Sequence, residues 1–335
     1  MRGWKQLAIA GIGVAISVLA ILSILNQVGA DQLLNAFRTA RYEYVLMSLV
    51  VIVLGLLARG VRWRVLLNDE LSTGRSFFIM NIGYMVNGLL PLRLGEVGRA
   101  YLAYRAAPSI PVVRALSTIV VERILDLLSV LVIMAIAIAS APVHEDLRRI
   151  AGAAAPTAVI GFFLLVGMSA QRERTLKIVH WVTDRIALLK KLNIARFADH
   201  FLDGLTPLTQ PRMLFRTLLW TVISWGFSLL SGYLLMPAFF GAPDWIGVFL
   251  FSAAASFANA LPAAPGSLGT YEYSILISFQ SLGYQDAAVI TGFAVMIHAL
   301  NLGANAVLGI IGFVQEGLTL SQLAQQVRGI QQPSS

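Results

Sequence analysis

Long apolar runs dominate the pattern of this chain, and a helical membrane crossing needs about 20 mostly apolar residues. Six runs predict such crossings: residues 7–25, 44–58, 117–140, 151–168, 214–236 and 287–313. Two further apolar stretches are interrupted. Residues 77–90 run into Pro91, while residues 246–260 break at Pro262 and restart over residues 271–282. Each half is too short to cross comfortably, so these stretches predict two re-entrant or broken helical hairpins.

Composition supports an all-α polytopic membrane protein. Of the 335 residues 57% are hydrophobic and 13% charged, and the mean hydropathy is +0.75. Soluble domains contain about 25% charged residues. The absence of cysteine excludes a disulfide framework, a thiolate nucleophile and an iron–sulfur cluster. We expect one membrane domain over residues 1–316 and a short cytoplasmic tail over residues 317–335.

Basic residues predict the topology, because cytoplasmic loops are enriched in Lys and Arg. The N-terminus and residues 59–75, 93–114 and 170–212 are basic and are placed inside. The stretch 77–90 lies between two inside segments, so it must enter from the cytoplasm and return. Both termini are then cytoplasmic. A cleavable signal peptide is the competing interpretation of the first run, but that run is longer than the usual apolar region of a signal peptide.

An internal repeat links the two interrupted stretches. The pattern L-P-x-x-x-G-x-x-G occurs at residues 90–98 and again at 261–269, and the flanking crossings recur at the same offset. Repeat one covers about residues 7–140 and repeat two about residues 151–313. Each unit holds three crossings, so the second must be inverted, as in many transporters. The alternative is a helical bundle in which the two motifs are simple helix breaks.

The first motif and the crossing after it carry charges at membrane depth: Arg93, Glu96, Arg99, Glu122, Arg123 and Asp126. An unpaired charge there costs between about 2.5 and more than 10 kcal/mol, so partners or water are required. Glu122 and Asp126 are four residues apart on one helix face, and we expect them to face Arg93 and Arg99. The cluster predicts a water-accessible site for an anionic head group, since guanidinium matches phosphate oxygens. Alternatively, these charges only neutralise one another at the cytoplasmic interface.

The second copy is nearly uncharged, and its candidate cavity residues are Asn259, Pro262, Gly266, Gly269, Glu272, His298 and Asn301. His298, Asn301 and Asn305 form a polar stripe along one helix. Such a stripe either hydrogen-bonds to neighbouring helices or lines the cavity with His298 as a proton-linked group. The asymmetry between the copies places the stronger anion site toward the cytoplasm.

Catalytic motifs are not recognisable, and we expect no enzyme activity, metal or cofactor. Ser267 with His298 suggests an intramembrane protease, but the G-x-S-G arrangement is missing and the equivalent residue in the first copy is Glu96. The basic segment 170–212 contains regularly spaced apolar residues and predicts amphipathic helices that bind anionic lipids of the inner leaflet. An ordinary basic connector explains it equally well. The topology accounts for the pI near 10.0 without nucleic acid.

The residues of these motifs resemble the signature of the membrane domain of lysylphosphatidylglycerol synthase, a family also called flippase-like. The resemblance rests on residues 87–99, 121–126 and 261–272. It implies lipid translocation: in bifunctional members this domain is thought to move aminoacylated phosphatidylglycerol to the outer leaflet. Other relatives are linked to polyprenyl-linked glycan or hopanoid pathways.

One departure limits what the resemblance implies. Bifunctional members carry a soluble aminoacyl-transferase domain after the membrane part, whereas this sequence ends soon after residue 313, so synthase activity is not carried over. We expect a stand-alone flippase or scramblase-like transporter of the cell (plasma or inner) membrane. Its substrate would be a phospholipid or another lipid-linked head group. The sequence leaves open whether the protein forms a homodimer. The alternatives are a membrane-embedded transferase acting on a lipid-linked sugar, or a non-transporting accessory subunit.

Overall fold

The computed structural model describes residues 15–89, 93–140, 145–185, 194–260 and 265–317. All regular structure within these ranges is helical. The first helix among the described residues is Ala15–Leu25. The other helices are α2 (Ala30–Thr39), α3 (Tyr42–Leu66), α4 (Thr73–Leu89), α5 (Leu94–Ala106), α6 (Val112–Ser140), α7 (Glu145–Ala170), α8 (Arg172–Arg185), α10 (Ile194–Asp203), η2 (Thr206–Leu208), α11 (Pro211–Phe240), α12 (Trp245–Ala260), η3 (Pro265–Ser267), α13 (Thr270–Ser281) and α14 (Ala287–Glu316).

Three of these helices, α3, α11 and α14, are long and apolar enough to cross a membrane. The bent pair Ala15–Leu25 and Ala30–Thr39, with an angle of 80° between its helices, is a fourth candidate. The protein is therefore a multi-pass membrane protein. Helices α6 and α7 cover the other two predicted runs, and the full set of six crossings stays a prediction.

Helix α3 corrects one assignment made from the sequence. The apolar run ends at residue 58, and we placed the arginines that follow it in a cytoplasmic loop. The helix instead continues to Leu66, and the Arg62 side chain is completely buried. Arginine is stable there because carboxylates on α6 neutralise it, as described below.

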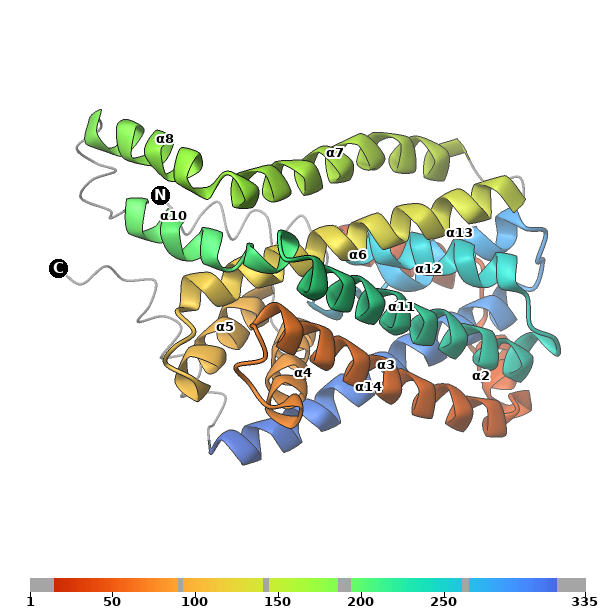
Figure 1. The fold of residues 1–335 in the computed structure, drawn as a ribbon. Helices are drawn as coiled ribbons and strands as arrows, with labels where there is room; N and C mark the ends of the chain where they lie inside the picture. Colours follow the sequence, from red (N-terminus) through yellow and green to blue (C-terminus); the bar gives the residue numbers. More distant parts are fainter. Residues whose placement is uncertain (1–14, 90–92, 141–144, 186–193, 261–264, 318–335) are drawn as a thin grey trace.

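Residues 77–89 of the first interrupted stretch lie within the single helix α4 and do not turn back within that stretch, which corrects the expectation; α4 packs on α5, which lies in a segment that the sequence placed on the cytoplasmic side. The second interrupted stretch forms α12 and α13, which pack on each other. Gly95 allows the first contact, because a Cβ at this position would lie 2.0 Å from the carbonyl oxygen of Gly83. The Asn87 side chain accepts a hydrogen bond of 2.8 Å from the Gly95 amide and so caps the start of α5. Figure 1 shows the pair α4–α5 at one end of the long helices and the pair α12–α13 at the other.

The long helices pack in a regular set of pairs. Helix α3 lies along α11, α4 packs on α14, and α12 packs on α6. A cluster of buried aromatic rings holds the second hairpin to α14. The ring of Phe279 lies 5.8 Å from that of Phe251 and 5.5 Å from that of Phe293. Each such ring pair adds about 0.5–1.5 kcal/mol of stability beyond the contribution of its buried apolar area, so these contacts stabilise the packing of the second hairpin on α14.

The segment 170–212 forms helices, as its pattern predicts. Helices α8 and α10 pack on each other at the edge of the molecule (Figure 1). Several of their large apolar side chains are exposed, including Ile178, Trp181 and Phe197. The Arg185 guanidinium lies 3.6 Å from the centre of the Trp181 ring. This combination is typical of helices that lie on a membrane surface.

Candidate functional site

A network of buried and partly buried ion pairs joins α3, α5 and α6. The Arg62 guanidinium contacts Asp126 with distances of 2.7 and 3.3 Å and lies 3.5 Å from Glu122. Glu122 also pairs with Arg99. Arg123 reaches Glu96 at 3.1 Å and Asp126 at 3.7 Å. Three arginines therefore balance three carboxylates.

Aromatic side chains complete this network. The Arg99 guanidinium lies 4.1 Å from the centre of the Trp63 ring, and the Trp63 indole donates a hydrogen bond of 3.1 Å to Thr118. The Trp225 indole of α11 donates to Asp126 at 3.3 Å. Removing one member of a buried pair leaves an uncompensated charge and costs about 3–5 kcal/mol. The network thus fixes how the first hairpin sits against the long helices.

Arg93 does not have the carboxylate partner that the sequence predicted. The sequence placed Glu122 and Asp126 opposite Arg93 and Arg99, and only the pairing of Arg99 with Glu122 is found. The Arg93 guanidinium instead donates a hydrogen bond of 2.6 Å to the carbonyl oxygen of Asn259, near the end of α12. The reason is geometric. Arg93 has a left-handed backbone with φ of 53° and stands before the first turn of α5, on the side that faces the second hairpin.

A cavity of about 580 Å³ lies between the two hairpins and the long helices. It is lined by residues of α3, α4, α5, α6, α11, α12, η3, α13 and α14. Gly88 and Gly266 lie beside each other on its wall. A Cβ at Gly266, where φ is 67°, would be 3.4 Å from the Gly88 carbonyl oxygen. The broken ends of the two hairpins therefore meet at the cavity.

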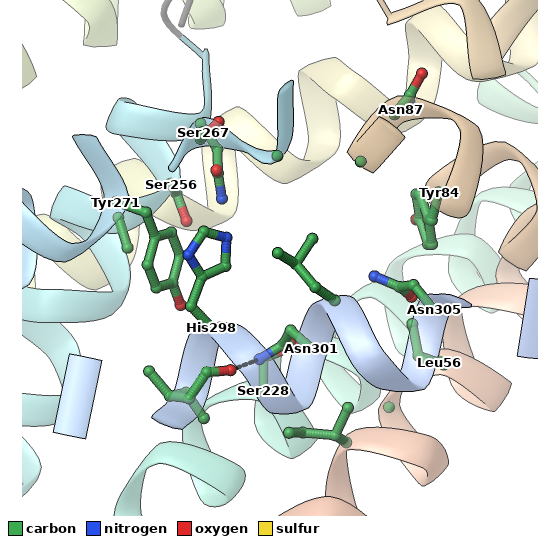
Figure 2. A pocket seen from close by; sticks show the side chains of 18 of the residues that line it. Leu56, Tyr84, Asn87, Ser228, Ser256, Ser267, Tyr271, His298, Asn301 and Asn305 are labelled. Atoms are coloured by element: carbon green, nitrogen blue, oxygen red, sulfur yellow. Dashed lines mark hydrogen bonds between the residues drawn. The ribbon is translucent and has the colours of Figure 1, made fainter. Parts of the chain in front are cut away.

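Hydroxyl and amide groups supply much of the polar lining: Ser228, Ser231, Ser252, Ser256, Ser267, Asn87, Asn259, Asn301 and Asn305. Figure 2 shows Asn87 and Tyr84 on one side, Ser256 and Ser267 on the other, and His298, Asn301 and Asn305 along α14 between them. Among the described residues, the Oδ1 atom of Asn305 is buried without a hydrogen-bond partner. An unsatisfied acceptor in a polar cavity is suited to a ligand or water that donates a hydrogen bond.

The charged residues of the cavity lining give it a positive character. They are Arg59, Arg93, Arg123 and Glu96. Glu96 is paired with Arg123, whereas the hydrogen bonds of Arg59 and Arg93 to described residues go to neutral oxygens. Arg59 donates to the Ser228 hydroxyl at 2.9 Å. Two guanidinium groups with neutral partners attract an anion.

The second copy contributes a compact group of three side chains. The Nδ1 atom of His298 lies 2.5 Å from Oε1 of Glu272, and the Tyr271 ring stacks on the imidazole with 4.2 Å between ring centres. Oε2 of Glu272 accepts a hydrogen bond of 2.7 Å from the Gly269 amide. His298 and Tyr271 line the cavity, and Glu272 lies behind them.

The structure divides the residues predicted as site residues into two sets. Those that line the cavity are Arg93, Glu96, Arg123, Asn259, Gly266, His298 and Asn301. Arg99, Glu122, Asp126, Gly269 and Glu272 support it from outside the lining. Gly269 faces the first helix, because a Cβ there would lie 2.7 Å from the Ser17 carbonyl oxygen. Pro262 lies outside the described residues.

Arg59, Arg62 and the serines were missed. The arginines were assigned to a loop, although their spacing of three residues would place both on one face of a longer helix. The serines do carry a signal. Ser252, Ser256 and Asn259 recur at helical spacing, as do Ser228 and Ser231, and a polar stripe inside an apolar run indicates a lined cavity.

Comparison with known proteins identifies the family. The family model described as "Lysylphosphatidylglycerol synthase TM region" matches residues 10–309. The chain belongs to this family. The match contains every residue that lines the cavity, and it confirms the resemblance seen in the sequence motifs.

Two curated proteins illustrate what the chain is similar to. A "UPF0104 membrane protein" of Methanothermobacter thermautotrophicus is 25% identical over 279 residues, which cover 80% of this chain and 82% of that protein. "Glycosyltransferase AglD" of Haloferax volcanii is 20% identical over 367 residues, which cover 97% of this chain. The chain spans 59% of the length of AglD.

Proposed function

We propose that this protein is a flippase or scramblase-like transporter that moves a lipid with an anionic or aminoacylated head group between membrane leaflets. The observation that carries the proposal is the positively charged polar cavity at the junction of the two broken hairpins. Non-helical backbone at membrane depth occurs only where it is buried in protein or lines a water-filled cavity. A polar head group that crosses the bilayer requires such a water-filled cavity.

The size and chemistry of the cavity suit a head group. Binding pockets for small ligands measure about 300–1,000 Å³, and the cavity has about 580 Å³. Arg59 and Arg93 would bind the phosphate, each exchanging a neutral oxygen partner for a charged one. The serine and asparagine side chains would replace water around hydroxyl or amino groups. The acyl chains would stay among the exposed apolar side chains that face lipid.

Helix packing supports the inverted repeat. In the proposed repeat, α4, α5 and α6 of the first copy correspond to α12, α13 and α14 of the second, and α3 corresponds to α11. The contact of α4 with α14 therefore corresponds to the contact of α12 with α6, and the contact of α3 with α11 corresponds to itself. Such packing is expected of two units related by a pseudo-two-fold axis, as in transporters that open alternately to each side. The two hairpins would then enter the membrane from opposite faces.

The proposed transporter lies in the cell membrane with both termini in the cytoplasm. The end that carries α4–α5 also carries α8 and α10 (Figure 1). These helices would rest on the inner leaflet, with their exposed apolar side chains among the lipids and their basic residues against anionic head groups. Head groups would enter near Arg93 from this side.

A translocation assay tests the proposal. Purified protein is reconstituted into phosphatidylcholine vesicles that contain fluorescent phosphatidylglycerol, lysylphosphatidylglycerol or phosphatidylcholine. We expect wild type to move at least one of the first two. We expect the double variant Arg59→Gln/Arg93→Gln to lose at least about 90% of the rate, since two charge-assisted contacts contribute about 1.5–3 kcal/mol each.

The control replaces Arg41, which is exposed and pairs with Glu43 far from the cavity lining. Arg41→Gln should keep the wild-type rate. If wild type leaves all three lipids in place, autonomous transport of these lipids is wrong.

The named relative AglD motivates a second candidate, a membrane-embedded transferase that acts on a lipid-linked sugar. Glu96 lines the cavity and would act as its acid or base. Transfer of sugar from a radioactive donor nucleotide to membrane lipid, abolished in Glu96→Gln, would support this candidate. An accessory subunit without transport is the third reading, and it predicts lipid binding with neither translocation nor transfer.

A further inference from the structure

His298 occupies a distinct position in the cavity wall. It lies on α14, within the long helix that packs against the first hairpin, and its side chain and that of Glu272 are both more than nine-tenths buried. Ionisable residues at such depth are rare and mark ion or proton paths. The head-group contacts proposed above use Arg59 and Arg93 and leave this pair without a role.

Hydrogen bonds around Glu272 indicate which nitrogen of His298 carries the proton. Oε2 of Glu272 accepts from the Gly269 amide at 2.7 Å, and Oε1 lies 2.5 Å from Nδ1 of His298. Glu272 as a carboxylate is an acceptor only, so Nδ1 of a neutral His298 carries the hydrogen. The lone pair is then on Nε2. Figure 2 shows the imidazole beside Tyr271 at the edge of the open space of the cavity.

We propose that the His298–Glu272 pair is a proton-binding site that couples the binding of an anionic head group to proton uptake. This inference rests on the proposed function and adds an energy source to it. Nε2 takes one proton from a hydronium ion of the cavity water: the Nε2 lone pair forms an N–H bond, one O–H bond of the hydronium breaks, and a neutral water molecule remains. The imidazolium keeps its Nδ1–H hydrogen bond to Glu272. The charge of the pair changes from −1 to zero.

The surrounding charges explain the coupling. Arg59 of α3, the hairpin residues Arg93 and Glu96, and Arg123 of α6 line the cavity, together with Tyr84 of α4 and Tyr271 of α13. Helices α2 and α11 also pack on α14 and contribute no charged residue to the described lining. An empty cavity with three arginines and one glutamate disfavours an added proton. A bound phosphate offsets the arginines and favours the proton, and the effect is reciprocal.

A purely structural role is the competing explanation. Glu272 would only cap α13 through the Gly269 amide, and His298 would only hold α13 against α14. In that case the pair would keep one protonation state whether or not a lipid is bound. A direct titration of His298 separates the two explanations.

The experiment titrates His298 by nuclear magnetic resonance in detergent micelles with ¹⁵N-histidine. The chain has four histidines, and the signal lost in His298→Gln assigns the relevant one. The probes are dihexanoyl-phosphatidylglycerol and, as a zwitterionic control, dihexanoyl-phosphatidylcholine. We expect phosphatidylglycerol to move the titration midpoint to higher pH by about one unit, which equals about tenfold tighter lipid binding to the protonated protein. Phosphatidylcholine should move it by much less.

Native mass spectrometry of the same samples measures lipid binding independently. Bound phosphatidylglycerol with an unchanged His298 midpoint, or a His298 that does not titrate between about pH 5 and pH 8, overturns the inference alone. Absence of bound anionic lipid overturns the proposed function and the inference with it. In the supporting case, Glu272→Gln should lower the midpoint and reduce its response to lipid, because the imidazolium loses its charged partner.

Discussion

Individual buried charges decide how the first hairpin is held. Arg99 and Glu122 are almost fully buried, and Arg99 also lies on the Trp63 ring. Buried charges stabilise the fold only when they are paired, since a single unpaired buried charge lowers the free energy of unfolding. Glu122 and Asp126 were recognisable from the sequence as charges within an apolar run. Their partner Arg62 was hidden among the basic residues near the C-terminal end of α3.

Replacing both partners of a pair in this network should cost less than the sum of the two single replacements. We expect Glu122→Gln to lower the free energy of unfolding in mixed micelles by about 3–5 kcal/mol, because Arg99 and Arg62 lose a countercharge. The double variant Glu122→Gln/Arg99→Met should cost at least 1 kcal/mol less than the sum of the single variants. Additive costs would show that the two residues do not form an energetic unit.

Asp69 provides a pH-dependent contact at the end of α3. Its carboxylate accepts two hydrogen bonds from Arg216, at 2.7 and 3.0 Å, and these hold its pKa below the usual range. A lowered pKa in the folded state means that the stabilisation is complete above the unfolded value of about 3.9 and is lost as the pH falls through the folded pKa.

Asp69→Asn tests this contact. The backbone of Asp69 is left-handed with φ of 59°, a conformation that Asn also tolerates. At pH 7 the variant should lose about 1 kcal/mol or less, as is usual for a partly exposed pair. Its melting temperature should fall less steeply than that of wild type below about pH 4. Parallel acid profiles for the two proteins would contradict the assignment.

At the scale of helices, apolar pattern and proline position indicated most of the long elements. The second interrupted stretch forms α12 and α13, and the basic segment 170–212 contains α8 and α10, whereas α2 and α5 were not predicted as helices. The pattern could not give the end of α3 or the partner of Arg93. Both depend on contacts between distant segments, such as the hydrogen bond from Arg93 to Asn259. The cavity was only partly foreseen, because serine is weakly polar and is common in membrane helices.

Gly95 tests how closely the first hairpin must pack. Gly95→Ala would place a Cβ against the Gly83 carbonyl oxygen, where no flexible side chain can move away. We expect a loss of about 3 kcal/mol or more in the free energy of unfolding, and a weaker hydrogen bond from the Gly95 amide to Asn87. The matched control is Gly303→Ala in α14, where nothing lies within 4 Å. That variant should gain up to about 1 kcal/mol; similar effects at both sites would refute the close packing.

The whole molecule combines a charge-balanced scaffold with a cavity of net positive charge. Ion pairs among α3, α5 and α6 fix the scaffold, whereas the hydrogen bonds of Arg59 and Arg93 to described residues go to the neutral oxygens of Ser228 and Asn259. The family match covers residues 10–309 and therefore both hairpins and the cavity. The proposed passage of a polar head group would give a reason for two broken helices to meet at a polar space in a membrane protein.

Blocking the cavity tests this account most directly. The chain has no cysteine, so Gly88→Cys introduces a single thiol in the cavity wall, where its Cβ would meet only Leu302 at 3.4 Å. Gly74→Cys, at an exposed position with nothing within 4 Å, is the control. Each variant is reconstituted and its lipid translocation is measured before and after reaction with a bulky maleimide. Transport through the cavity predicts that translocation falls in proportion to labelling at position 88 and is unchanged at position 74. Fully labelled Gly88→Cys protein that moves lipid at its unlabelled rate would contradict it.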